Sequence, residues 1–366
     1  MGEIMEEEQL KMPKGYKIYL IVLLIAVIAL IIPASREKIF SSLNLFNQSQ
    51  KQLELVNEFD IDKGLEEIDI SKDKIIKWNK NELSFLDFNG FEVLKKESDF
   101  KDPIVYFGEE LIYLMDKSTG KAQLMDKEGT NTRELDLKFP FSKFKEDGDK
   151  LYVYRKDGDT ETVDIINKEG ELLKTHQENI PILSVIMGNK DQEYLAAVLD
   201  VDKDLKSMVG IYSIDGNDIG NLEFKDELVI YSEFLRDKVL IATDKKVYLL
   251  KDSVLEWDKE IKDIKDIKVV DKEIYLLYND KFEILNSKGD VKEEFVLETD
   301  LENIRLIEEG ILLFGKRDIL LPQKKHNILE FKSEEDIIDV KYDEGKLLIQ
   351  KEGKVAIYNI IEKGAN

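Results

Sequence analysis

The stretch LIYLMDKSTGKAQLMDKEG, residues 111–129, contains the pattern that decides the fold. Two apolar runs, LIYLM and AQLM, alternate with period two, as expected for β-strands whose successive side chains point to opposite faces. Gly120 and Gly129 follow these runs and supply the positive φ that tight hairpin turns need. The stretch therefore predicts two short strands joined by a tight turn and followed by a second turn.

The same layout recurs outward from this stretch over about 300 residues. Each unit has an apolar lead-in, a turn, an alternating strand, a second turn, another alternating strand and an outer segment rich in Glu and Lys. The second strand of a unit begins every 35 to 45 residues, a spacing typical of four-stranded propeller blades. The eight onsets are Lys74, Leu111, Leu151, Tyr194, Val239, Ile274, Ile311 and Leu347.

This repeat predicts an all-β protein, a 7–8-bladed β-propeller with four-stranded blades. A β-sandwich is the alternative, but many evenly spaced units favour a closed ring, which leaves no long sheet edge. We count eight units, and seven is the other reading because the first unit is weakly patterned. The last unit ends after residues 355–361 without an outer strand. Segment 53–61, LELVNEFDI, is expected to donate that strand and close the ring.

The N-terminal part contains one apolar run, IYLIVLLIAVIALII at residues 18–32. Fifteen residues give about 22 Å of helix, and flanking residues such as Tyr16 and Lys17 extend it toward the roughly 30 Å of a hydrocarbon core. We expect a single transmembrane helix, and a cleaved signal peptide is the alternative. The expected domains are a cytoplasmic tail (1–15), the helix (16–35), a stalk (36–52) and the propeller (53–366).

The orientation follows from the lysines and arginines beside the helix. Lys11, Lys14 and Lys17 precede it, and Arg36 and Lys38 follow it, so the positive-inside bias is slight. A short N-terminal tail usually stays in the cytoplasm, so the large C-terminal domain is expected outside the plasma membrane. The lipid bilayer is then one expected partner, bound through the helix.

Composition excludes several function classes. The formal net charge of −23 repels phosphate backbones, so nucleic acid is not an expected partner. The chain has no cysteine, which excludes disulfides, thiolate metal sites and cysteine nucleophiles. Its two histidines, His176 and His326, are far apart in sequence and offer no histidine pair for metal binding or acid–base chemistry.

One turn carries a family resemblance. Residues 115–121, MDKSTGK, are similar to the D-x-x-T-G-K turn of quinoprotein-type (PQQ-like) propeller repeats, with Leu124 where those repeats often have tryptophan. Residues 167–171 and 287–290 keep a degenerate form of this turn. The whole layout resembles a Gram-positive bacterial family with one N-terminal transmembrane helix and a PQQ-like or WD40-like propeller of unassigned function. The resemblance implies fold and anchoring, and no activity.

The quinone site of true quinoprotein enzymes is not expected in this chain. Docking tryptophans brace the blades in those enzymes, and a calcium-containing site holds the quinone. Here the sequence has only Trp78 and Trp257. We therefore predict no cofactor.

The run DVDKD at residues 200–204 is the one D-x-D-x-D pattern in the chain. Alternate carboxylates in a tight loop can converge on calcium, which takes six to eight oxygen ligands. The sixth position is Leu205 where such loops need Gly, and the twelfth is Ile211 where they need Glu. We expect a solvated hairpin tip at Asp200, Asp202 and Asp204 and no metal.

Two other acidic segments, 147–149 (DGD) and 157–160 (DGDT), are expected to be hairpin turns. Aromatic residues at alternating strand positions are expected to pack between blades, and a ligand-stacking platform is the alternative. These residues are Tyr106, Tyr113, Tyr152, Tyr154, Tyr212, Tyr248, Tyr275 and Tyr278.

The sequence contains no G-x-S-x-G, P-loop, H-E-x-x-H or sialidase-type motif, so no catalytic residue is predicted. The favoured function is a non-enzymatic, membrane-tethered module of the cell envelope that binds a protein as a scaffold or sensor. The alternative is a cell-envelope glycan-binding protein or enzyme that uses the central propeller cavity.

Overall fold

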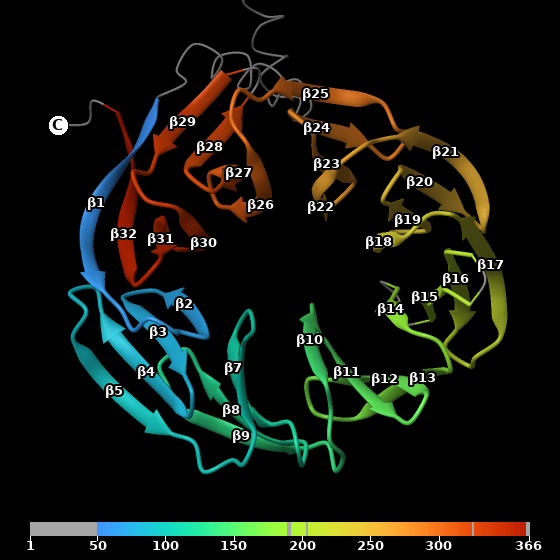
Figure 1. Ribbon diagram of the computed structural model, residues 1–366, viewed down its shortest axis with the longest axis horizontal. Coiled ribbons are helices and arrows are strands. Elements are labelled where there is room, and N and C mark those ends of the chain that lie inside the picture. The colour runs from blue at the N-terminus through green and yellow to red at the C-terminus, as the bar shows by residue number, and fades with distance from the viewer. Residues whose placement is uncertain (1–49, 189–191, 203, 324–325, 364–366) are drawn as a thin grey trace, which may run out of the picture. The chain divides into compact units, whose positions relative to one another are not determined.

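The computed structural model describes residues 50–363 apart from 189–191, 203 and 324–325. The regular structure in these residues consists of 32 strands in eight four-stranded antiparallel sheets. Figure 1 shows the sheets arranged as blades around a ring. The all-β propeller with four-stranded blades is therefore confirmed, and the number of blades is eight.

Seven blades are built from consecutive strands. Blades 1 to 3 contain β2 (Glu67–Ser71), β3 (Lys74–Asn79), β4 (Glu82–Asp87) and β5 (Glu92–Glu97); β6 (Pro103–Phe107), β7 (Leu111–Asp116), β8 (Lys121–Asp126) and β9 (Asn131–Asp136); β10 (Lys143–Asp147), β11 (Lys150–Asp157), β12 (Thr160–Asn167) and β13 (Leu172–Glu178). Blades 4 and 5 contain β14 (Ile182–Met187), β15 (Glu193–Asp200), β16 (Lys206–Ser213) and β17 (Asp218–Lys225); β18 (Val229–Leu235), β19 (Lys238–Thr243), β20 (Lys246–Lys251) and β21 (Val254–Glu260). Blades 6 and 7 contain β22 (Ile264–Val270), β23 (Glu273–Tyr278), β24 (Lys281–Asn286) and β25 (Val291–Val296); β26 (Leu301–Ile307), β27 (Gly310–Gly315), β28 (Asp318–Gln323) and β29 (His326–Lys332).

The eighth blade joins the two ends of the described chain. It contains β30 (Ile337–Asp343), β31 (Lys346–Lys351) and β32 (Lys354–Glu362), and its outer strand is β1 (Lys51–Asp60). β1 pairs antiparallel with β32, as expected for segment 53–61. Lys351 Nζ also lies 2.7 Å from Glu58 Oε2, so an ion pair accompanies the strand pairing.

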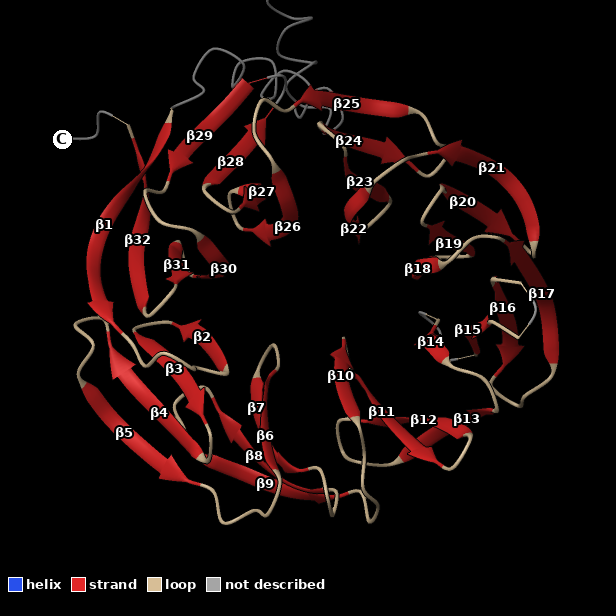
Figure 2. Ribbon diagram, in the orientation of Figure 1, coloured by secondary structure: helices blue, strands red, loops and turns tan. Residues whose placement is uncertain are grey.

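Within each blade we name the strands A to D from the ring's centre to its rim, as Figure 2 shows. The B strands begin at residues 74, 111, 150, 193, 238, 273, 310 and 346, each within one residue of the predicted onset. The spacing of the repeat therefore located every blade.

Period-two alternation sends successive side chains to opposite neighbours of a blade. Ile112 and Leu114 of β7 pack against blade 1, whereas Tyr113 and Met115 pack against blade 3. Eight such apolar clusters exist among the described residues, one between each pair of adjacent blades. The core therefore lies between the blades, which is why both faces of a B strand are apolar.

Outer strands pack on glycines in the C–D turns of the next blade. Gly289 has a φ of 82°, and an added Cβ would lie 2.9 Å from Cδ2 of Trp257 on β21 of the preceding blade. In the same way Leu135 of blade 2 covers Gly170 of blade 3. Leu124, which stands where quinoprotein-type repeats often have tryptophan, is buried on the C strand β8. The turn that resembles quinoprotein repeats, residues 116–121, lies at the B–C end of its blade, where the connection to blade 3 packs on it: the Leu137 N–H donates to the Gly120 carbonyl (3.0 Å).

The predicted tail and transmembrane helix (1–35) and the stalk up to residue 49 lie outside the described residues. Within residues 50–363, gaps excepted, no helix long and apolar enough to cross a membrane is found.

Candidate functional site

Two faces of the propeller carry its loops. The A–B and C–D turns lie on one face, which we name the A–B face, because consecutive strands are antiparallel. The B–C turns and the connections from each D strand to the next A strand lie on the other, which we name the B–C face. Any site outside the core must be built from one of these faces, from the rim, or from the innermost strands.

The innermost strands carry charge around the propeller axis. In most blades, one residue of strand A pairs with the third residue of strand B. The residue at this position is polar in seven of the eight A strands. Four of these side chains are cations that lie beside aspartates of the A strands. The ion pairs are Lys145–Asp147 (3.2 Å), Lys268–Asp266 (3.4 Å), Lys341–Asp339 (2.9 Å) and Arg305–Asp339 (3.0 Å).

Glu233 on β18 occupies the same position but behaves differently. Its Oε1 accepts a hydrogen bond from the N–H of Phe234 (3.2 Å). Burial, and next the negative charge of Asp147, raise the pKa of Glu233 to about 7, against the smaller opposing effect of Lys145. The hydroxyl of Tyr231 faces the same charges. A carboxyl that titrates near neutral pH marks this part of the axis as a candidate site.

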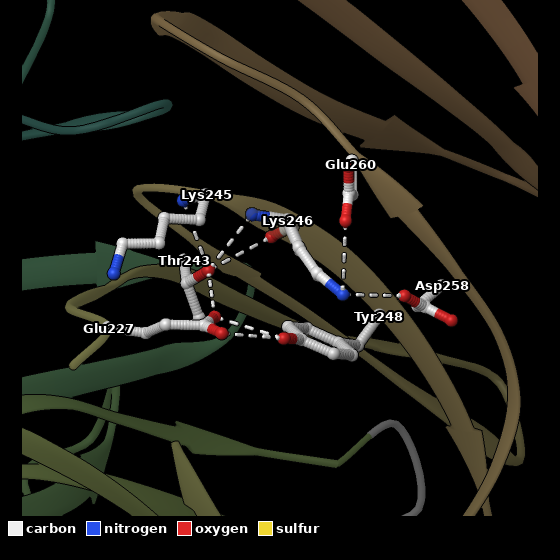
Figure 3. Close-up of polar contacts among 7 residues, drawn as sticks. All are labelled: Glu227, Thr243, Lys245, Lys246, Tyr248, Asp258 and Glu260. Carbon is white, nitrogen blue, oxygen red and sulfur yellow. Dashed lines mark hydrogen bonds and ion pairs between the residues drawn. The ribbon is translucent and has the colours of Figure 1, made fainter. Parts of the chain in front are cut away.

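A second polar group lies on the B–C face of blade 5 (Figure 3). Thr243 Oγ1 donates to Glu227 Oε2 (2.6 Å), and the Tyr248 hydroxyl donates to the same carboxylate (2.9 Å). Lys246 Nζ lies 3.2 Å from Asp258 Oδ2. These contacts tie the connection from blade 4 to strands B, C and D of blade 5. The network therefore has a structural role.

Buried carboxylates also join neighbouring blades. Glu146 on β10 accepts hydrogen bonds from the Glu109 N–H (3.0 Å) and the Tyr113 hydroxyl (3.3 Å) of blade 2, and it pairs with Lys168 Nζ (2.8 Å). An added Cβ on Gly108 would lie only 2.0 Å from Glu146 Oε2, so a glycine at this position leaves the space that the carboxylate occupies. The Glu146 carboxylate therefore holds blades 2 and 3 together through these hydrogen bonds.

Two further buried carboxylates are bound within their own blade or from the preceding one. Asp164 on β12 is bound by Arg155 Nε (2.8 Å) and by the Thr175 hydroxyl (2.6 Å). Glu283 on β24 is bound by the Tyr278 hydroxyl (2.6 Å) and by Lys259 from the preceding blade. Glu146, Asp164 and Glu283 therefore already have partners.

The acidic run lies at the tip that joins β15 and β16, as predicted: Asp200 ends β15, and Asp202 and Asp204 lie between the two strands. The Asp202 N–H donates to Asp200 Oδ1 (3.1 Å), and Lys206 Nζ lies 3.3 Å from Asp200 Oδ2. Among the residues that the structure describes, no group of three or more His, Asp or Glu is placed to hold a metal. Asp204, the third carboxylate of this run, is exposed to solvent.

The other predicted turns and aromatic residues lie where the pattern indicated. Residues 147–150 form the A–B turn of blade 3, and residues 157–160 form its B–C turn. All eight tyrosines contribute to the clusters between blades, which confirms the core prediction for Tyr106, Tyr113, Tyr152, Tyr154, Tyr212, Tyr248, Tyr275 and Tyr278.

The two histidines lie in different blades. His176 on β13 is buried against the rings of Tyr194 and Tyr212, and its Nε2 lies 3.2 Å from Glu178 Oε1. Burial lowers the pKa of His176, so the imidazole is neutral at pH 7. His326 belongs to β29 of blade 7. The fold therefore places the two histidines in separate blades, 3 and 7.

Exposed apolar side chains on the B–C face were not singled out by the sequence. Val201 and Leu205, in the β15–β16 connection, are 60% and 40% exposed, and Ile230 at the start of β18 is 45% exposed. The long spacing of the fourth unit was the available signal, because an enlarged connection lengthens the repeat. Glu233 gave no signal, since charged residues are common throughout the chain.

Solved structures with the same fold include two propellers. Sqt1 of Saccharomyces cerevisiae is 9% identical, with 85% of this chain and 100% of that one covered and a TM-score of 0.57. BamB of Moraxella catarrhalis is 12% identical, with 84% and 99% covered and a TM-score of 0.52. At these identities the likeness shows the fold alone.

Comparisons of sequence give one result. No curated protein matches the chain. The model of one family, described as a family of unknown function (DUF5711), matches residues 46–360. This match reaches all eight blades.

Proposed function

The chain belongs to the DUF5711 family of unknown function, and we propose that it is a membrane-anchored, extracytoplasmic propeller that binds a protein partner and catalyses no reaction. The apolar run of residues 18–32 supports the anchor, and the short tail before it supports export of the large domain. The propeller fold shared with Sqt1 and BamB suits a protein-interaction module, by analogy of fold.

One observation carries the binding proposal. The clusters between the eight blades already bury the apolar core, yet large apolar side chains remain exposed on loops and outer strands. Val201 on the B–C face and Val254 on the rim are 60% and 67% exposed. Exposed apolar groups that the fold does not need are typical of surfaces that a partner covers.

The proposal is tested on full-length protein in its own membranes. Chemical cross-linking, detergent solubilisation and purification of the chain should recover a protein partner in a fixed ratio. Protease added to intact spheroplasts should digest the region after Arg36. Protection of that region until lysis would contradict the extracytoplasmic orientation, and recovery of the chain alone would contradict the binding.

A second candidate function has one observation in its favour. Glu233, with its pKa raised to about 7, is the kind of carboxyl that enzymes use as a general acid. A glycan-binding protein or enzyme acting at the propeller axis would depend on this side chain. Retention of a cell-envelope glycan by the parent and its loss in Glu233→Gln, without any protein partner, would favour this candidate.

A further inference from the structure

Every outer strand of the propeller carries a β-bulge toward its A–B end. The pairing of strand D with strand C shifts there by one residue, as it does next to Leu255 in blade 5 and next to Asn131 in blade 2. The two residues that share the bulge and the one before them therefore occupy equivalent places in all blades. We name these three residues the bulge window, which is 254–256 in blade 5 and 130–132 in blade 2.

The bulge windows hold most of the exposed apolar side chains in the described part of the chain. Fifteen large apolar side chains are exposed there, and nine of them lie in bulge windows, although each blade contributes only three residues to its window. The apolar exposure is therefore tied to one place in the blade. The nine residues are Leu55, Val56, Phe91, Val93, Leu172, Ile219, Val254, Leu255 and Val291.

The fold does not require apolar residues in the bulge window. In blade 2 the window is polar, Thr130, Asn131 and Thr132, yet β9 pairs with β8 through the same bulge. The outer strand of blade 2 also packs on the next blade in the usual way, with Leu135 against Gly170. Because exposed apolar groups on outer strands favour aggregation, their retention in other blades points to a surface that a partner covers.

Four consecutive blades form the longest series of apolar windows. Blades 3, 4, 5 and 6 follow one another around the ring (Figure 1), and each exposes a large aliphatic side chain in its window. The described window residues of blades 2 and 7, on either side of this series, include no exposed large apolar side chain. We name the five side chains of the series the rim arc: Leu172 (62% exposed), Ile219 (45%), Val254 (67%), Leu255 (49%) and Val291 (46%).

Contacts between neighbouring blades make the rim arc continuous. Between blades 3 and 4, Lys174 Nζ donates to a carbonyl in the C–D turn of blade 4 (2.9 Å). Between blades 4 and 5, Ser253 faces Gly220, and each of these two residues is next in sequence to a residue of the arc. Between blades 5 and 6, the indole of Trp257 lies over Gly289. The apolar side chains are therefore displayed by strands that are fixed against one another.

Negative charge without a partner cation surrounds the rim arc. The lysines beside the arc are already bound, as Lys168 is by Glu146 (2.8 Å) and Lys251 by Asp237 (2.9 Å), and the exposed Lys288 is the exception. Burying unpaired carboxylates is unfavourable, so a surface that covers the arc must bring cations to them. Four exposed carboxylates beside the arc lack a cation partner among the described residues: Glu171, Asp215, Asp252 and Asp290.

We propose that the rim arc is the docking surface for a segment of the partner protein in which apolar side chains are flanked by Lys or Arg. This inference rests on the proposed function and adds to it the surface and the chemistry of the partner. The apolar side chains of the segment cover Leu172, Val254 and Leu255, and its cations pair with Asp215 and Asp252. The charge pairs give specificity and speed association more than they add affinity.

The first experiment places a photo-cross-linking amino acid at position 254 of the full chain, and at position 91 as the matched control. Val254 and Phe91 are 67% and 71% exposed and occupy the same place in their bulge windows, but Phe91 belongs to blade 1, across the ring from blade 5. After irradiation in native membranes, position 254 should join a protein segment that contains apolar residues beside Lys or Arg. Position 91 should give at least about tenfold less of that product.

The second experiment gives blades 5 and 1 the polar residues of blade 2. Val254→Thr/Leu255→Asn reproduces residues 130 and 131 in the rim arc and should lower recovery of the cross-linked partner about tenfold or more. Phe91→Thr/Val93→Thr reproduces residues 130 and 132 in blade 1 and should leave recovery unchanged. Melting temperatures should agree within about 2 °C, because these are surface changes that blade 2 already accommodates.

The third experiment tests the charges. Asp215→Asn/Asp252→Asn should weaken recovery of the partner at low salt and have less effect at high salt, where the charges are screened. Asp157→Asn/Asp159→Asn removes two exposed carboxylates from the B–C turn of blade 3 and should leave recovery unchanged. Equal effects of the two variants would show that only the net charge of the chain matters and would contradict the pairing at the rim arc.

The outcomes separate the two proposals. A protein product at position 91 alone, equal products at both positions, or a partner recovered only by chemical cross-linking overturns the rim arc but leaves the proposed function standing. A product at 254 with lipid, with glycan, with a second copy of the chain or with a segment lacking Lys and Arg also overturns the rim arc. Absence of any protein product from either position, together with recovery of the chain alone after chemical cross-linking, overturns both.

Discussion

The junctions between blades and the rim arc use apolar residues in opposite ways. At the junction of blades 5 and 6, the indole of Trp257 on the outer strand lies over Gly289 in the turn of the next blade. At the junction of blades 4 and 5, the glycine is instead on the outer strand, and Gly220 faces Ser253 in the turn of the next blade. In the rim arc, Val254 is 67% exposed and nothing in the repeat requires it. The junctions thus show complementary fitting, and the rim arc shows apolar surface free for binding.

The largest effect is expected from removing the closing strand. Deletion of residues 51–60 leaves blade 8 with three strands and exposes the edge of β32. It also removes Leu53 and Phe59 from the clusters on either side of that blade. We expect the melting temperature to fall by more than about 10 °C, or cooperative unfolding to be lost, as followed by circular dichroism. An unchanged melting curve would mean that β1 does not close the ring.

A smaller loss is expected from overfilling a single junction. Gly108→Ala places a Cβ against the Glu146 carboxylate and separates that buried group from its partners. The free energy of unfolding should fall by about 2–3 kcal/mol in denaturant titrations. The control is Gly148→Ala, where the φ of 57° is unfavourable for alanine but nothing lies within 4 Å. It should cost about 1 kcal/mol, and equal losses in the two variants would deny the role of Glu146.

The axis should respond to pH through Glu233. Its folded-state pKa is raised to about 7, above the roughly 4.3 of an unfolded chain, so ionisation costs stability as pH rises between these values. Glu233→Gln should therefore melt a few degrees higher than the parent at pH 8 and alike near pH 4.5. The pKa of Glu58 is lowered, mainly by its hydrogen bond from Lys351, so Glu58→Gln should be less stable at pH 8. The same sign in both variants would contradict this assignment.

The smallest effect is expected at the acidic run in the B–C connection of blade 4. Asp200→Asn/Asp202→Asn/Asp204→Asn should change the melting temperature by less than about 2 °C, because the loop is a solvated hairpin tip. Calcium should not stabilise the parent. A calcium-dependent rise of several degrees that disappears in the triple variant would show a metal site there.

The sequence predicted the parts of the molecule that repeat. The alternation of residues 111–115 recurs with each blade, and a glycine like Gly129 recurs in most of them, so the spacing of the repeat located eight B strands within one residue. The closing role of residues 53–61 followed from the missing outer strand of the last unit. Glu233 could not be found in this way, because its pKa is raised by burial and next by Asp147 from another blade, and only the folded ring provides both.

The turn that resembles quinoprotein repeats is not a turn on which a neighbouring blade's outer strand docks, for a related reason. The D-x-x-T-G-K pattern at residues 116–121 has the composition of the packing turn but occupies the B–C end of blade 2. The turns that do carry docking residues, such as the one with Gly289, differ from it by their position after strand C. Composition identifies a turn, whereas the order of strands decides what packs on it.

The most direct test measures partner recovery and melting temperature together in two variants of the full chain. Val254→Thr/Leu255→Asn should lose most of the cross-linked partner and melt within about 2 °C of the parent. Gly108→Ala should melt clearly lower but keep its partner at temperatures where it is folded. Retention of the partner by the first variant, with the binding of the parent unchanged, would contradict the claim that exposed apolar residues of the rim arc bind a protein.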